Sequence, residues 1–483
     1  MKRVLIKIQE CTKGVEVEMK NNVKHESTKG LVKEIESIIE VIVLSVIYYI
    51  IWNQFHNEGP LPLYLGKGKY VLMGIYAFFI YVFVKNTDGF QFGDLRRFDL
   101  GLAQWIGVLM TNAVTYFQLC LIANHMISPL PMLMLTAIDI LVTTAFIFLY
   151  VHIYRRTYAP HKMIMIFGSE AALTLKIKID SREDKYNIKK MISAEEGFEK
   201  ICEEVVKYDA VVINDVPAQI RNDILKFCYK NQLRVYVVPK ITDVILGGAK
   251  DVSVFDTPIL LVKGTGLSIM QKGIKRLMDI ILCVIAMIPA TPIMLIIALA
   301  IKLEDGGPVF YKQKRVTRGG ETFDILKFRS MIVNAEQAGI SIPATGDDPR
   351  ITKVGKVIRA LRVDELPQIL NILKGDMSVV GPRPERVEHV EEYTKEIPEF
   401  EYRLKVKGGL TGYAQIYGKY NTSAYDKLRM DLMYIENYSL LLDIKLILTT
   451  VRIMFHKEST EGFEKAAENQ KKLKELLNSE ENK

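Results

Sequence analysis

Apolar residues are strongly segregated along this chain of 483 residues. Four apolar stretches occupy the N-terminal third, at 35–52, 70–84, 102–123 and 130–151. Most are close to the ~20 residues that a helix needs to cross a bilayer, although the second is short. The alternative is a soluble four-helix bundle, but such helices carry a polar face and these do not. The pattern therefore predicts a membrane α-helical bundle of four helices over 35–156.

Lysine and arginine residues near these stretches predict their orientation. Eight precede the first stretch, two lie in the first loop, three in the second and none in the third, and Arg155 and Arg156 follow the fourth. Basic residues favour the cytoplasmic side of a membrane. We therefore expect a cytoplasmic N-terminal segment over 1–34, which has no signal-peptide core. Everything after Arg155 is also expected in the cytoplasm.

The pattern changes to short β-branched runs between helical segments over 157–262. Runs at 163–167, 210–213 and 235–238 are typical of buried parallel strands, and 218–230 has an amphipathic period. We expect a Rossmann-like α/β domain. The turn after its first strand has one glycine, Gly168, and no GxGxxG pattern, so the sequence favours a structural or regulatory role over a nucleotide site.

A fifth apolar stretch, 277–301, has Pro289 and Pro292 at its centre and basic residues on both flanks. Proline removes a backbone donor and kinks a helix. If the segment spanned the membrane, one basic flank would lie outside, against the charge bias. We therefore predict a re-entrant helix over 274–302 that breaks at Thr291 and Pro292, where the threonine hydroxyl can bind a carbonyl freed by proline. A proline-kinked spanning helix is the alternative.

Composition excludes several classes of protein. The net charge of +8, from 64 basic and 56 acidic residues, is too small over this length to indicate a nucleic-acid binder. The five cysteines are scattered, with no CxxC pair, which argues against a disulfide framework or a zinc site. The charged tail over 457–483 is expected to be a solvated helix.

The last third of the chain combines Arg and Lys with Gly, Pro and Asp, as expected of a rigid pocket for a polyanion. Within it, Asp364 and Glu365 precede a helical run at 369–373. Asp364 could simply cap that helix. It could also act as a nucleophile, because an ionised carboxylate needs no general base to attack phosphorus.

Motifs over residues 274–454 resemble the bacterial sugar transferase family, the polyprenyl-phosphate hexose-1-phosphate transferases (large monotopic phosphoglycosyl transferases). The matching strings, in chain order, are KRLMD at 275–279, KFRSM at 327–331, DELPQ at 364–368, GPRPE at 381–385, GGLTGYAQ at 408–415 and DLMYI at 431–435. The resemblance implies a C-terminal α/β catalytic domain over 263–456. It also implies anchoring by the re-entrant helix on the cytoplasmic face of the bacterial inner (plasma) membrane.

The resemblance further implies transfer of a sugar-1-phosphate from a UDP-sugar to polyprenyl (undecaprenyl) phosphate, with release of UMP, at the start of exopolysaccharide, capsule or O-antigen synthesis. Asp364 matches the nucleophile, Glu365 completes the dyad, and Mg²⁺ is the expected cofactor, with Asp364 as its contact. Five cations in matching positions are expected to bind anionic substrate groups: Arg359, Lys327, Arg329, Arg350 and Arg383. Thr291, where the family often has serine, is a mild departure.

Two other classes of function remain to be weighed. A catalytically inactive membrane sensor or scaffold would bind a nucleotide in the Rossmann-like domain, and the intact DELPQ motif argues against it. A membrane-anchored nucleotide-sugar dehydratase would need a GxGxxG turn and a Tyr-x-x-x-Lys pair on a helix, and the α/β segment has neither. The sequence does not define the transferred sugar or the polysaccharide pathway, and it leaves a homodimer open.

Overall fold

The computed structural model describes residues 2–55, 67–169, 171–182, 184–333, 348–418 and 422–454. The chain divides into two compact units, with the boundary between Val238 and Pro239. The tail that was predicted over 457–483 lies outside the described residues.

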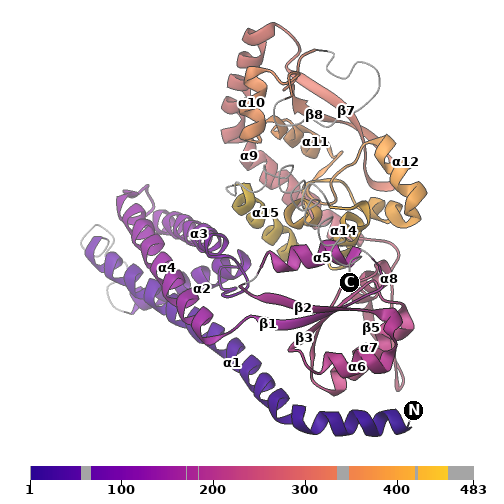
Figure 1. Ribbon diagram of the computed structural model, residues 1–483. Coiled ribbons are helices and arrows are strands. Elements are labelled where there is room, and N and C mark those ends of the chain that lie inside the picture. The colour runs from indigo at the N-terminus through magenta and orange to yellow at the C-terminus, as the bar shows by residue number, and fades with distance from the viewer. Residues whose placement is uncertain are drawn as a thin grey trace. The chain divides into compact units, whose positions relative to one another are not determined.

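Four long helices begin the first unit: α1 (Lys2–Phe55), α2 (Gly68–Asn86), α3 (Arg97–Ala123) and α4 (Leu130–Thr157). α1 packs against α2 and α4, and α3 packs against α2 and α4, so the four close into a bundle (Figure 1). Each contains a segment long and apolar enough to cross a membrane, Thr28–Phe55 in the case of α1. The predicted bundle of four apolar helices is confirmed.

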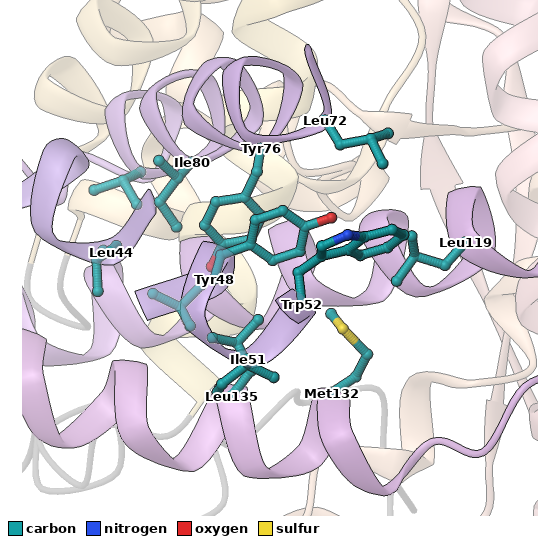
Figure 2. Packing of buried hydrophobic residues seen from close by; sticks show 12 residues of the cluster. Leu44, Tyr48, Ile51, Trp52, Leu72, Tyr76, Ile80, Leu119, Met132 and Leu135 are labelled. Atoms are coloured by element: carbon teal, nitrogen blue, oxygen red, sulfur yellow. The ribbon is translucent and has the colours of Figure 1, made fainter. Parts of the chain in front are cut away.

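Aromatic and aliphatic side chains fill the interior of this bundle. The rings of Tyr48 on α1 and Tyr76 on α2 stack with centroids 4.3 Å apart, and Trp52 lies beside them (Figure 2). Leu119 from α3 and Met132 from α4 join the same cluster. The cluster therefore joins all four helices.

Polar side chains also lie inside the bundle, which the apolar pattern did not predict. The Tyr76 hydroxyl lies 2.9 Å from an oxygen of Asp139 and 3.0 Å from the amide oxygen of Asn112. The amide of Gln104 donates to Glu40 over 3.0 Å. Each contact joins two different helices, and such bonds hold membrane helices together where water is excluded.

A parallel sheet of four strands follows the bundle: β1 (His161–Phe167), β2 (Tyr186–Ser193), β3 (Ala210–Asn214) and β4 (Arg234–Val237), in the order β2-β1-β3-β4. The helices around it are α5 (Ala171–Asp180), α6 (Phe198–Val205) and α7 (Ala218–Lys230), with the 3-10 turn η2 (Ala194–Glu196). Three strands and α7 match the predicted segments, and β2 is additional. The Rossmann-like assignment stays a prediction.

Gly168, at the end of β1, has a packing role. A Cβ atom there would lie 2.3 Å from the carbonyl oxygen of Asp215, which follows β3. Only glycine allows the two strand ends to approach this closely. The lone glycine of this turn is therefore explained without a bound phosphate.

The second unit begins with α8 (Ile241–Gly247) and the hairpin of β5 (Lys250–Val254) and β6 (Thr257–Leu261). Two further small sheets follow, antiparallel β7 (Phe310–Val316) with β8 (Thr322–Phe328), and parallel β9 (Ser378–Val380) with β10 (Gly409–Thr411). The remaining elements are α9 (Ile269–Asp305), η3 (Arg318–Gly320), α10 (Lys353–Ala360), η4 (Val363–Glu365), α11 (Gln368–Lys374), α12 (Val387–Glu396), η5 (Pro398–Lys405), α13 (Tyr413–Tyr417), α14 (Ala424–Glu436) and α15 (Leu440–Met454). The predicted C-terminal α/β region is confirmed.

Helix α9 covers the segment in which the sequence predicts a helix break. It starts with a capping box in which Ser268 and Gln271 bind each other's backbone N–H. It is one continuous helix that contains Pro289 and Pro292 and is long enough to span a membrane. The Thr291 hydroxyl donates to the Met287 carbonyl over 2.7 Å. The carbonyls that lose their helical donor to Pro289 and Pro292 are those of residues 285 and 288. The predicted hydrogen bond from Thr291 to a carbonyl freed by proline is therefore wrong. The re-entrant course of the helix stays a prediction.

Candidate active site

The carboxylates Asp364 and Glu365 lie on the short 3-10 turn η4, between α10 and α11. Arg362, just before them, has the left-handed φ of +55°, a conformation that costs an L-residue roughly 1–2 kcal/mol. Pro367 occupies the N-cap of α11, and no side chain caps that helix. Asp364 is therefore not its cap, and the structural alternative for this residue is wrong.

Two cations hold the Glu365 carboxylate. Lys327, near the end of β8, donates to its Oε1 over 2.6 Å, and Arg383 donates to the same oxygen over 2.9 Å. Burial acts to raise the pKa of Glu365, but Arg383 and Lys327 outweigh it, and the pKa lies well below its ordinary value. Glu365 is therefore ionised at neutral pH.

Asp364 behaves in the opposite way. Burial raises its pKa, the charge of Glu365 adds to that effect, and Lys327 and Arg359 oppose it. Among the described residues its carboxylate accepts no side-chain hydrogen bond. The pKa of Asp364 is thus raised and that of the adjacent Glu365 is lowered. In enzymes, such opposite shifts give two carboxylates different chemical roles. The more basic and less engaged one is the better nucleophile.

Arg359 lies in the last turn of α10, half-buried, and its charge lowers the pKa of Asp364. Three of the predicted cations, Lys327, Arg359 and Arg383, therefore act on the dyad. This grouping was expected from motifs that lie up to 56 positions apart in the sequence (383 − 327).

The other two predicted cations are engaged with carboxylates elsewhere. Arg329, 6% exposed, makes a two-pronged pair with Asp305 and donates to the Pro308 carbonyl over 2.7 Å. The Nη2 atom of Arg350 lies 2.6 Å from an oxygen of Asp348. These contacts give no support to a phosphate-binding role for either arginine, which stays a prediction from sequence.

Gly307 leaves room for the Arg329 guanidinium. A Cβ atom there would lie 2.7 Å from a guanidinium nitrogen of Arg329. The glycine thus lets the chain pass close to the arginine directly after α9. We interpret the Arg329 clamp as the structural connection between α9 and β8.

Backbone carbonyls at the end of α11 are also bound by cations. Arg276 on α9 donates to the carbonyls of Ile372 and Leu373 over 2.5 and 2.6 Å, and Lys407 donates to that of Gly375. Cations at a helix C-terminus satisfy free carbonyls and complement the helix dipole. The helix that follows the dyad is thereby fixed at its far end.

Sequence reasoning missed two arginines near the site. Arg315 donates to the Pro384 carbonyl over 3.1 Å, and Arg403 donates to the Arg383 carbonyl over 2.8 Å. Both hold the loop that carries Arg383. Their sequence surroundings, KQKRV and EYRLK, are indistinguishable from ordinary charged surface.

The donor set fits a magnesium ion that is shared with a substrate. The described residues contain no group of three or more His, Cys, Asp or Glu side chains able to hold a metal alone. Mg²⁺ is usually bound by one or two carboxylates together with substrate phosphates and waters. The Asp364 carboxylate can supply one such ligand, while the Oε1 of Glu365 is bound by two cations.

A family model described as bacterial sugar transferase matches residues 270–457. A UDP-glucose:undecaprenyl-phosphate glucose-1-phosphate transferase of Caulobacter vibrioides is 41% identical over 182 residues, which are 37% of this chain and 68% of that protein. The chain belongs to the bacterial sugar transferase family.

Other members of the family are similar over a longer stretch. A UDP-N-acetylgalactosamine-undecaprenyl-phosphate N-acetylgalactosaminephosphotransferase of Aeromonas hydrophila is 42% identical over 259 residues, 51% of this chain and 59% of the relative. A UDP-glucose:undecaprenyl-phosphate glucose-1-phosphate transferase of Escherichia coli K12 is 40% identical over 211 residues, 43% of this chain and 44% of the relative. The chain thus spans about half the length of these two sugar transferases.

Proposed function

We propose that this sugar transferase moves a sugar-1-phosphate from a UDP-sugar to undecaprenyl phosphate through a covalent intermediate on Asp364. One observation carries the proposal. A carboxylate with a raised pKa, which accepts no side-chain hydrogen bond from the described residues, lies next to a second carboxylate that two cations hold ionised.

In the first step an Asp364 oxygen attacks the phosphorus that bears the sugar. The new carboxyl–phosphorus bond forms as the pyrophosphate bond breaks, and the bridging oxygen leaves with its electron pair as part of UMP. In the second step a phosphate oxygen of undecaprenyl phosphate attacks the same phosphorus, and the Asp364 carboxylate is regenerated. Neither step needs an external base, because both nucleophiles are anions.

The cations around the dyad act on the charge of the transferred group. Lys327 and Arg383 neutralise Glu365, so that a phosphoryl group beside it is not repelled. The positive charge of Arg359 acts on Asp364, and the Arg359 guanidinium can bind a phosphate oxygen. Mg²⁺, held by Asp364 and the substrate phosphates, would neutralise the pyrophosphate and the leaving UMP when bound.

The membrane supports the choice of acceptor. The described residues include five helices long and apolar enough to cross a membrane, and the names of the relatives above give undecaprenyl phosphate as their acceptor. With α9 re-entrant, both of its basic ends lie in the cytoplasm of a bacterium, at the inner membrane. The catalytic unit would then meet UDP-sugar from the cytosol and the lipid phosphate at the interface, in the first membrane step of exopolysaccharide, capsule or O-antigen synthesis.

The test is UMP release from a panel of UDP-sugars by membranes that contain the full chain. We expect release to depend on Mg²⁺ and sustained turnover to depend on undecaprenyl phosphate, with ping-pong kinetics. The panel includes UDP-glucose, UDP-galactose and their N-acetylated forms. No release from any of them, with tight nucleotide binding to residues 157–262, would favour the sensor instead.

A further inference from the structure

The loop Gly381–Glu385 carries Arg383 to Glu365, and each of its five backbone carbonyls accepts a hydrogen bond. The donors to residues 381, 382 and 385 are the Gln415 side-chain amide and the backbone N–H groups of Gly409 and Val316, at 3.3, 2.8 and 3.0 Å. The donors to Arg383 and Pro384 are the guanidinium groups of Arg403 and Arg315. This fixation concerns the backbone, because the Arg383 side chain itself is 45% exposed.

Packing alone restrains an exposed arginine poorly, since its long side chain has many rotamers. Whether the Arg383 side chain reaches Glu365 therefore depends on the position of the Arg383 backbone. The only donor to the Arg383 carbonyl that the described contacts show is Nη2 of Arg403, over 2.8 Å.

Arg403 is in turn held by the carboxylate of Asp431, and its Nη1 atom also lies 4.0 Å from an oxygen of Glu385 in the loop. Asp431 on α14 accepts from Nε and Nη2 of Arg403 through a single oxygen, at 2.9 and 2.8 Å. The two side chains are 3% and 1% exposed. Phe400 covers the guanidinium from one face, with its ring centroid 4.8 Å away. Asp431 belongs to the DLMYI motif, to which the proposed mechanism gives no role.

We propose that Asp431 and Arg403 are positioning residues of the transferase, a buried pair that sets the Arg383 backbone so that the Arg383 side chain reaches Glu365. Neither residue contacts the dyad in the described structure. Their effect on the reaction passes through the Arg383 carbonyl. The inference rests on the proposed function for its catalytic consequence, but the placement of the loop can be measured without it.

The surroundings of Asp431 suit such a role. Burial raises its pKa to about 6, against the opposing charge of Arg403. The other charges that act on it are Glu385 from the loop and Lys427 from α14 itself. Protonation of Asp431 below about pH 6 would weaken the bond that holds Arg403.

The first measurement is amide hydrogen exchange of the full chain in detergent, comparing Asp431→Asn and Arg403→Lys with the native protein. Asp426→Asn is the matched control, because Asp426 also pairs with an arginine, Arg429, on the same helix but has no contact with the loop in the described structure. We expect faster exchange in the peptide that covers 378–386 in both test variants and unchanged exchange in the control. Unchanged exchange in folded test variants would overturn the proposal.

The second measurement is a double-mutant cycle on UMP release. Asp431→Asn is expected to lower kcat about 10- to 100-fold, as a small misplacement of a catalytic group can, and to have little further effect in the Arg383→Gln background. An equal loss in both backgrounds would show a role independent of Arg383 and would contradict the proposal. If the native chain releases no UMP at all, the proposed function fails, and the exchange experiment still decides the inference.

Discussion

Replacing Lys327 by methionine removes one of the two cations that hold Glu365 and keeps the unbranched shape of the side chain. The lost contact is a charge-assisted hydrogen bond of 2.6 Å. Such bonds contribute about 1.5–3 kcal/mol. Both side chains are partly exposed and Arg383 remains, so we expect the loss of this bond to cost about 2 kcal/mol of transition-state stabilisation. That cost corresponds to a roughly 30-fold lower kcat/KM.

The same variant should change the pH dependence of stability. The pKa of Glu365 lies below its ordinary value in the folded chain, so its ion pairs stabilise the fold at neutral pH. That contribution is lost as the pH falls through the folded pKa. Without Lys327 the folded pKa rises, and the loss begins at a less acidic pH. The pKa of Asp364 also rises, because Lys327 opposes the effect of burial there.

The assay is the initial rate of UMP release between pH 5 and 8, with saturating undecaprenyl phosphate, alongside thermal unfolding. Lys374→Met is the matched control, since the side chain of Lys374 is 75% exposed where it pairs with Asp376 over 3.1 Å. Exposed pairs contribute little, so the control should keep its activity. The electrostatic account of the dyad would be refuted if Lys327→Met released UMP at the native rate and lost stability at the same acidic pH as the native chain.

Three further predictions follow from other parts of the chain. Gly375→Ala should lower the free energy of unfolding by about 1 kcal/mol, seen as a lower Tm, because Gly375 ends α11 at a φ of +101°; an unchanged Tm would contradict this. Chelation by EDTA should stop UMP release and added Mg²⁺ should restore it, whereas activity that persists in EDTA would remove the metal from the mechanism. Cysteines that replace the exposed Met270 and Leu303, at the two ends of α9, should both react with an impermeant maleimide from the cytoplasmic side only; labelling from opposite sides would make α9 a spanning helix.

Segments with a strong apolar pattern were predictable from the sequence. The bundle helices, β1, β3, β4 and α7 all follow from uninterrupted apolar or amphipathic runs. β2 was not predicted, because its centre contains Lys189 and Lys190. It lies at the edge of the sheet and pairs with β1 alone, so it tolerates charged residues that a central strand would not.

The site was predictable only in its motif residues. Asp364, Glu365, Lys327, Arg359 and Arg383 are grouped as the motifs implied. The partners of the other arginines depend on tertiary contacts that no local pattern encodes, as in the pairs of Arg329 with Asp305 and Arg403 with Asp431. The buried acids of the membrane bundle were missed for a similar reason, since single polar residues barely change the mean hydropathy of a long apolar helix.

The most direct test of the central claim is to trap the intermediate. Purified full-length chain is incubated with UDP-sugar and Mg²⁺ without lipid acceptor, and the peptide that contains Asp364 is analysed by mass spectrometry. We predict a mass increase equal to one sugar-1-phosphate on Asp364, discharged by undecaprenyl phosphate and absent in Asp364→Asn. Full turnover by Asp364→Asn, or an adduct on a different residue, would contradict the account.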